Sequence, residues 1–168
     1  FARTKNADDC ALLFVCVDRV KVLAGLYKAT QNKPLYEFMC RDFSEQRHRD
    51  AALKNAYALL SKHRYSFAAA FFILGGQPLD AASLVWKHDR DLSLTLVIAR
   101  LAAKKHVEGM HSTVGHLTND VVSMLQNDIA PTVSDPWTLA ALRWLAGDFT
   151  GFFSSMNSLM ETYAVDAT

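Results

Sequence analysis

The residues whose types could do chemistry gather in one polar segment, residues 106–116. It holds His106, Glu108, His111 and His116, and imidazole and carboxylate groups are common ligands of a Zn²⁺ ion that activates water for hydrolysis. The spacing matches no HExxH motif, and the Pro-Cys-x-x-Cys half of the zinc-deaminase signature is missing. The segment also contains two glycines, which favour a loop. We therefore expect exposed loop histidines and no metal ion.

Other catalytic and nucleotide-binding motifs are absent from the sequence. It contains no G-x-S-x-G nucleophile motif, no G-x-G-x-x-G loop and no GxxxxGK[ST] loop. Acidic residues such as Asp8, Asp9, Asp89 and Asp91 lie where helices should begin, and carboxylates interact favourably with that end of the helix dipole. The sequence therefore predicts a protein that is not an enzyme and that holds no cofactor.

The cysteine content, net charge and hydropathy restrict the class of protein further. Cys10, Cys16 and Cys40 form no CxxC pair and lie in or beside apolar runs, which predicts reduced packing residues of a cytosolic protein. The net charge is +1, from 18 basic and 17 acidic residues, which argues against a nucleic-acid-binding protein. The longest apolar run, residues 67–74, is far shorter than the ~20 residues that cross a membrane.

A basic region that begins near residue 41 is one candidate for contact with a partner. It is either a solvated face or a surface for an acidic partner or lipid headgroups. The candidate protein-contact residues are Arg47, Arg49, Lys62, His63 and Arg64.

The three tryptophans are the other candidate. Trp86, Trp137 and Trp144 lie within apolar helical stripes. We favour core packing for them and keep a binding hot spot as the alternative, because tryptophan is over-represented at such sites.

The elements that must position these residues are helices. Four apolar residues follow the offsets 0, 3, 4 and 7, which places them on one helix face. They are Leu53, Ala56, Tyr57 and Leu60. Polar residues 61–64 then predict a turn, and the apolar run 67–74 contains three alanines, which favour a helix over a strand. Because this run has no polar face, we expect it to be buried on several sides.

Helix boundaries are marked along the chain by caps, prolines and glycines. Asn6 and Ser44 are expected N-caps, Pro78 and Asp135–Pro136 are expected helix starts, and residues 75–76 and Gly147 are expected stops. Residues 92–96 alternate like a strand, but a cap at Asp91 and the helix-forming residues that follow favour a helix.

These signals predict nine or ten helices, and hence an all-α fold in a single helical region, residues 1–168. Residues 59–65 and 144–149 share a plan of apolar pair, polar turn and aromatic helix start, which indicates repeated helical hairpins. Stacked hairpins form an α-solenoid segment, and a compact helical bundle is the alternative.

Residues 51–72 resemble a segment of the DmX-like/rabconnectin-3 family, the large subunits of the RAVE complex, which regulates V-ATPase assembly. Further similar blocks follow in the family's order at residues 3–12, 74–81, 96–101 and 135–149. The sequence departs from the family at Ser61, where glycine is expected, at Pro78 and at Ala102, and residues 106–131 match no family block.

The resemblance implies a function as well as a fold. It implies a non-catalytic scaffold that promotes V-ATPase assembly, joining V1 to V0, and so organelle acidification. The implied partners are V1 subunits and a rogdi-like RAVE subunit. The implied location is cytoplasmic, peripheral on endosomal, vacuolar or vesicle membranes, with membrane association only indirect through the pump.

The chain begins with Phe1, so we expect an interior fragment of a larger chain, and the resemblance places WD-repeat propellers upstream of it. A vesicle-coat or membrane-trafficking adaptor is the alternative function, because such subunits also combine propellers with α-solenoids. A metal-dependent enzyme that uses His106, His111 and His116 is the third hypothesis.

Overall fold

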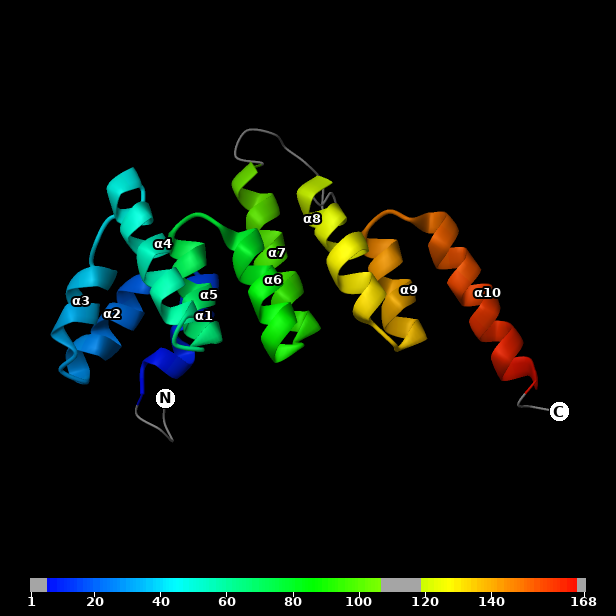
Figure 1. Ribbon diagram of the computed structural model, residues 1–168, viewed down its shortest axis with the longest axis horizontal. Helices are drawn as coiled ribbons and strands as arrows, with labels where there is room; N and C mark the ends of the chain where they lie inside the picture. The colour runs from blue at the N-terminus through cyan, green and yellow to red at the C-terminus, as the bar shows by residue number, and fades with distance from the viewer. Residues whose placement is uncertain (1–5, 107–118, 166–168) are drawn as a thin grey trace. The chain divides into compact units, whose positions relative to one another are not determined.

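Helices make up the regular structure of the chain (Figure 1). The computed structural model describes residues 6–106 and 119–165, with side chains described for residues 6–101 and 119–160. Within these ranges there is no strand, so the all-α prediction is confirmed. The elements are α1 (Asp8–Cys16), α2 (Val20–Ala29), α3 (Lys33–Met39), α4 (Gln46–Leu60), α5 (Tyr65–Leu74), α6 (Pro78–Asp89), α7 (Leu92–His106), α8 (Asn119–Met124), a π-helix η1 (Leu125–Ile129), a 3₁₀-helix η2 (Ala130–Thr132), α9 (Pro136–Leu145) and α10 (Phe149–Val165). They fall into two compact units, Phe1–Ala102 and Ala103–Thr168.

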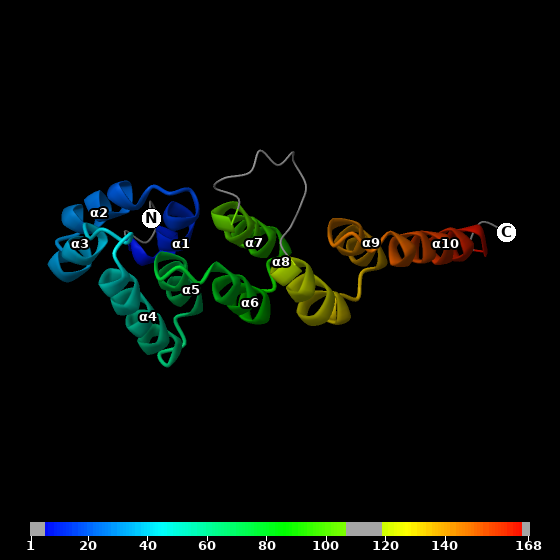
Figure 2. The ribbon, with the colours of Figure 1, turned by 90° about the horizontal axis from the view of Figure 1, so that it is seen from above.

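Helix α5 is the centre of the first unit. It packs against α1, α4 and α6 (Figure 2), and every residue from position 67 to position 74 is buried. Ala68, Ala69 and Ala70 are completely buried, and their short side chains let neighbouring helices approach closely. The structure thus confirms the prediction of a helix that is covered on several sides.

Aromatic rings join α3 to α5. Phe71 is 2% exposed and stacks on Phe38 with ring centroids 5.2 Å apart. The ring of Phe67 meets the same Phe71 ring edge-on at 5.0 Å, and Phe43 lies 5.6 Å from Phe38. These contacts place the largest side chains of α5 against the N-terminal helices.

One backbone motif closes five of the turns that the structure describes. In each turn a residue with positive φ donates its N–H to the carbonyl three residues earlier, at 3.0–3.1 Å, and the next residue donates to the carbonyl five residues earlier, at 2.8–3.1 Å. This pair of bonds is the Schellman motif, which satisfies the last carbonyls of a helix. The positive-φ residues are Asp18, Gln31, His63, Gly76 and Gly147. Both hairpin turns predicted from the sequence, at residues 59–65 and 144–149, belong to this set.

Gly76→Ala should destabilise the first unit by about 1–2 kcal/mol, because a residue with a Cβ atom is strained in the left-handed region. The φ of Gly76 is +84°, and an added Cβ would meet only Arg49 Cδ, at 3.5 Å, so backbone strain rather than crowding is tested. Gly25→Ala in α2 is the matched control. Its Cβ would meet nothing within 4 Å, and alanine should stabilise the helix by about 0.5–1 kcal/mol. Urea denaturation measures both changes, and equal stabilities would contradict the expectation.

The second unit is built on α9 and α10, which pack against each other. The sequence, with Pro131, predicts a loop at residues 129–134. Instead the helical path of α8 continues through η1 and η2 to Thr132, so this prediction is wrong for its first part. Ile129 is completely buried and Val121 and Leu125 are buried on the same path, which holds the chain helical. Pro131 is tolerated because the start of a 3₁₀-helix needs no N–H there.

Several boundary predictions are confirmed and two caps are corrected. Asp91 accepts the Leu94 N–H at 3.0 Å, and the segment is helix rather than strand. The N-cap of α4 is Glu45 and not Ser44, whose own N–H donates to Asp42 Oδ1 at 2.9 Å. Likewise α1 begins after Ala7 instead of Asn6. Asn6 Oδ1 accepts the Asp8 N–H at 3.1 Å, so its side chain still contacts the first turn of α1.

Asp135 is the N-cap of α9, as predicted, and accepts the Thr138 N–H at 2.7 Å. Hydrogen bonds from Thr138 hold the pKa of the Asp135 carboxyl below its ordinary value. The carboxylate therefore stabilises the fold above the ordinary aspartate pKa of about 3.9, and this contribution is lost as the pH falls through the lowered value.

Asp135→Ala should lower the melting temperature at neutral pH, and the difference from the wild type should shrink below about pH 4. Asp135→Asn should stay close to the wild type, because asparagine is an equally good N-cap. Circular dichroism melts over a pH series measure these differences. An alanine effect as large in acid as at neutral pH would contradict the assignment.

Candidate functional site

The five candidate contact residues lie at opposite ends of α4. Arg47 and Arg49 are in its first turn, and residues 62–64 are in the turn that follows it (Figure 1). A helix of 15 residues is about 22 Å long. The structure therefore places these residues in two groups and does not bring them together as one patch.

Arg64 takes part in a hydrogen-bond network that links helices of the first unit. Its Nη2 donates to Asp8 Oδ2 at 2.5 Å, and its guanidinium lies 4.9 Å from the ring centroid of Phe67. Asp8 Oδ1 also accepts the Tyr27 hydroxyl at 2.8 Å, which joins α1, α2 and the start of α5. Burial, together with the hydrogen bond to Asp8, raises the pKa of Tyr27 above its ordinary value. The tyrosine therefore remains a neutral donor, and Arg64 has an internal structural role.

His63 and Arg49 also contact neighbouring residues. His63 Nδ1 is 2.7 Å from the Tyr65 hydroxyl, and the Tyr65 ring stacks on His88 of α6, with centroids 3.5 Å apart. Arg49 is half-buried, and its Nη2 donates to Gln46 Oε1 at 2.8 Å. These contacts link the turn after α4 to α6 and fix the first turn of α4.

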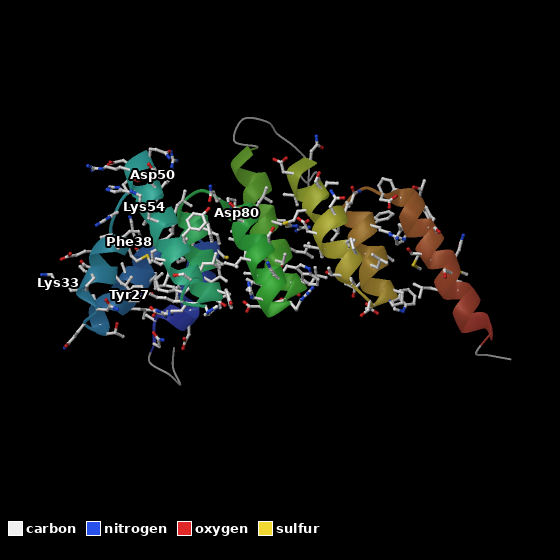
Figure 3. All side chains as sticks on the ribbon, in the orientation of Figure 1. Tyr27, Lys33, Phe38, Asp50, Lys54 and Asp80 are labelled. Carbon is white, nitrogen blue, oxygen red and sulfur yellow. The ribbon has the colours of Figure 1, made fainter. Side chains whose placement is uncertain are left out.

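A second set of exposed residues lies on α4 and in the turn that follows it. It consists of Lys54, Tyr57 and Lys62, which we name the basic face of α4. Lys54 is labelled in Figure 3. The 0, 3, 4, 7 pattern of apolar residues predicts that Tyr57 packs in the core with Leu53, Ala56 and Leu60. Tyr57 is 57% exposed, so this prediction is wrong. Ala56 is completely buried, and the rotation of 100° per residue places Tyr57 beside that buried stripe rather than on it.

An aromatic group is exposed in the second unit. Trp144 meets Phe149 and Phe152 with centroids 5.1 Å apart in both pairs, and it is 52% exposed. Trp137 is 49% exposed. Core packing is therefore the wrong prediction for these two tryptophans, because the buried positions of α9 are Ala140 and Leu142. The hot-spot alternative stays a prediction.

The residues singled out for metal chemistry are only partly described. His106 ends α7, and Glu108, His111 and His116 lie outside the described residues. Within the described residues, no three His, Cys, Asp or Glu side chains gather as they would around a metal ion. The same part of the chain also contains no helix with the length and apolar character of a membrane span.

The three cysteines are free thiols in the structure. Cys16 is buried, and burial raises the pKa of its thiol to about 11, which keeps it protonated and unreactive at neutral pH. Cys10 is half-buried and donates to the Ala7 carbonyl at 3.2 Å, while Cys40 is exposed. The packing role expected from the sequence fits Cys16 and Cys10, and exposed Cys40 is the exception.

Comparison with known proteins finds a matching family and several similar proteins. A family described as the C-terminal region of RAVE protein 1 matches residues 1–135. DmX-like protein 1 of Homo sapiens is 31% identical over 169 residues, covering 93% of this chain and 5% of the human protein. "Regulator of V-ATPase in vacuolar membrane protein 1" of Saccharomyces cerevisiae is 35% identical over 101 residues, covering 58% of this chain and 7% of the yeast protein. The Schizosaccharomyces pombe protein of that name is 30% identical over the same length.

The chain thus spans a small fraction of the length of these relatives. The matched residues 1–135 include the basic face of α4. They end before the exposed aromatic group of α9 and α10.

Proposed function

Since the chain belongs to the RAVE protein 1 C-terminal family, we propose that it is a segment of a regulator of the V-ATPase. One observation carries the proposal: the two yeast relatives are named as regulators of V-ATPase in the vacuolar membrane. The match to the human DmX-like protein over 93% of the chain supports the same assignment.

The proposed mode of action is that of a non-catalytic scaffold. It promotes assembly of the V1 part of the pump with the V0 part, and organelle acidification follows from that assembly. The central helix α5, buried between three neighbours, supports this role because a tightly packed unit holds its exposed side chains in fixed positions. Exposed side chains on α4 and on α9 and α10 offer surface for contact.

The proposed partners are V1 subunits and a rogdi-like subunit of the RAVE complex. The proposed location is the cytoplasm, peripheral to endosomal, vacuolar or vesicle membranes through the pump, and WD-repeat propellers would precede this region in the parent chain. Arg47, Arg49, Lys62, His63 and Arg64 remain proposed contact residues, with Arg49 and Arg64 weakened by their internal hydrogen bonds.

Depletion of the full-length parent protein tests the proposal. Organelle pH, read with a ratiometric dye, should rise, and affinity purification of the tagged parent should recover V-ATPase subunits. Normal organelle pH together with missorted cargo would contradict the proposal and favour a trafficking adaptor.

A further inference from the structure

We propose that the basic face of α4, formed by Lys54, Tyr57 and Lys62, binds an acidic segment of a partner protein. The inference deepens the proposed function and rests on it for the source of the partner, which is the soluble V1 part of the pump. It goes beyond the candidate residues taken from the sequence, since it adds Lys54 and Tyr57 and keeps only Lys62 of the five candidates.

Lys54 lies on the outward side of α4, with Tyr57 about 60° to one side of it and Lys62, just past the helix end, about 80° to the other. Ala52 and Ala56 are completely buried, and the rotation of 100° per residue places Lys54 about 200° from each of them. Lys62 follows the helix end, eight positions after Lys54, which corresponds to about 12 Å or two turns. Tyr57 lies between the two lysines along the axis. A partner helix with carboxylates two turns apart matches this spacing.

The charge on the face is not neutralised by its surroundings. Residues 51–79 include no aspartate or glutamate, and among the described residues neither Lys54 nor Lys62 forms an ion pair. Two nearby charged groups have partners of their own, although the hydrogen bond to neutral Gln46 leaves the charge of Asp50 in place. Arg47 pairs with Glu45 at 2.6 Å, and the Asp50 carboxylate accepts from Gln46 at 2.8 Å. The two lysines therefore offer unpaired positive charge, which an acidic surface complements.

Tyr57 supplies an ordered anchor on the flank of Lys54 that faces α5. Its ring meets Phe72 of α5 edge-on, with centroids 5.2 Å apart and an interplanar angle of 90°. Its hydroxyl has no hydrogen-bond partner within the part of the chain that the structure describes. A tyrosine held in this way gives contact area at a small entropic cost and can donate to a carboxylate, which is why tyrosine is enriched at binding hot spots.

The small number of positive charges on the face favours a protein partner over a membrane or a nucleic acid. Each lysine near an anionic membrane contributes about 1 kcal/mol, so two lysines give only about 2 kcal/mol, too little for stable attachment. Nucleic-acid binders neutralise roughly 6–10 phosphates, and the net charge of +1 does not support that. In binding to a protein partner, the tyrosine provides affinity, and the lysines provide orientation and a faster association rate.

The test measures binding of purified V1 to the full-length parent at low and physiological salt. Tyr57→Ala should weaken binding by about 10–100-fold. Lys54→Glu/Lys62→Glu should weaken it at least about tenfold at low salt and flatten its salt dependence. Lys21→Glu/Lys28→Glu is the matched control, because it makes the same charge change at two exposed lysines of α2 that are two turns apart. The control should bind like the wild type, and thermal melts should show that all variants fold.

Four outcomes would overturn the inference. Wild-type binding with an unaffected Lys54→Glu/Lys62→Glu variant rejects the face and leaves the proposed function standing, and so does an equal loss in the control. If the double variant loses only its binding to phosphatidylserine vesicles, the face serves a lipid instead. Failure of the wild-type parent to bind V1 removes the proposed function itself, together with the partner assumed here.

Discussion

Phe71→Ala should lower the free energy of unfolding by roughly 3–5 kcal/mol, the range for removal of a buried phenylalanine from a packed core. Phe71 is 2% exposed and lies between the rings of Phe38 and Phe67, at 5.2 and 5.0 Å. The alanine leaves a cavity at the centre of the first unit and removes the ring on which α3 packs. Both losses affect α5. As in other core truncations, neighbouring side chains are expected to relax into the cavity only in part.

Chemical denaturation measures the loss, and the melting temperature should fall by about 10 °C or more. Phe153→Ala is the matched control. It deletes the same atoms from a side chain that is 60% exposed, and it should change stability by less than about 0.5 kcal/mol. Similar losses in both variants would show that burial at α5 does not govern the stability of this chain.

Local sequence patterns predict the helices well because their signals are local. The run at residues 67–74 has no polar side, and this feature alone indicates burial on several sides, as observed for α5. Pro78, Asp91 and Asp135 mark helix starts through short-range chemistry. Asp91 and Asp135 each accept the N–H three residues later, and Pro78 has the fixed φ that suits a first helical position. These predictions need no knowledge of which helices become neighbours.

Exposure is harder to predict because it depends on the number of neighbours a helix acquires. Tyr57 and Trp144 continue the apolar pattern of their helices, yet each is more than half exposed. The pattern identifies a helix side that is suitable for burial, and packing then covers only part of it. In α4 the covered part is narrow, because Ala52 and Ala56 bring the helix close to its neighbours.

Local sequence patterns do not predict long-range contacts or turn geometry. Arg64 meets Asp8 across 56 positions, and no local spacing indicates that pair, so Arg64 reads as an ordinary basic surface residue. Three of the five Schellman turns place Asp18, Gln31 and His63 in the left-handed region instead of glycine. The common turn motif is therefore visible only in the backbone.

The role of Gly75 is also not predicted by its sequence context, which indicates only a helix stop. In the structure Gly75 is buried where α4 and α5 approach, and its φ of −73° is ordinary for any residue. A Cβ atom added here would lie 2.4 Å from Leu53 Cδ2 and 2.7 Å from Leu53 Cγ. The glycine is therefore required by the close contact between the two helices and not by the turn.

Gly75→Ala should destabilise the first unit by about 1–3 kcal/mol, the usual cost of overpacking a core. Leu53→Ala removes the atoms that the new Cβ would meet, and the half-buried leucine should itself be costly to truncate. In the double variant the two losses should not add, because the methyl group introduced at position 75 occupies space that the leucine side chain leaves. We expect a favourable coupling of about 0.5–3 kcal/mol from the double-mutant cycle, measured by urea denaturation. Additive losses would mean that the contact between Leu53 and position 75 is not what requires glycine there.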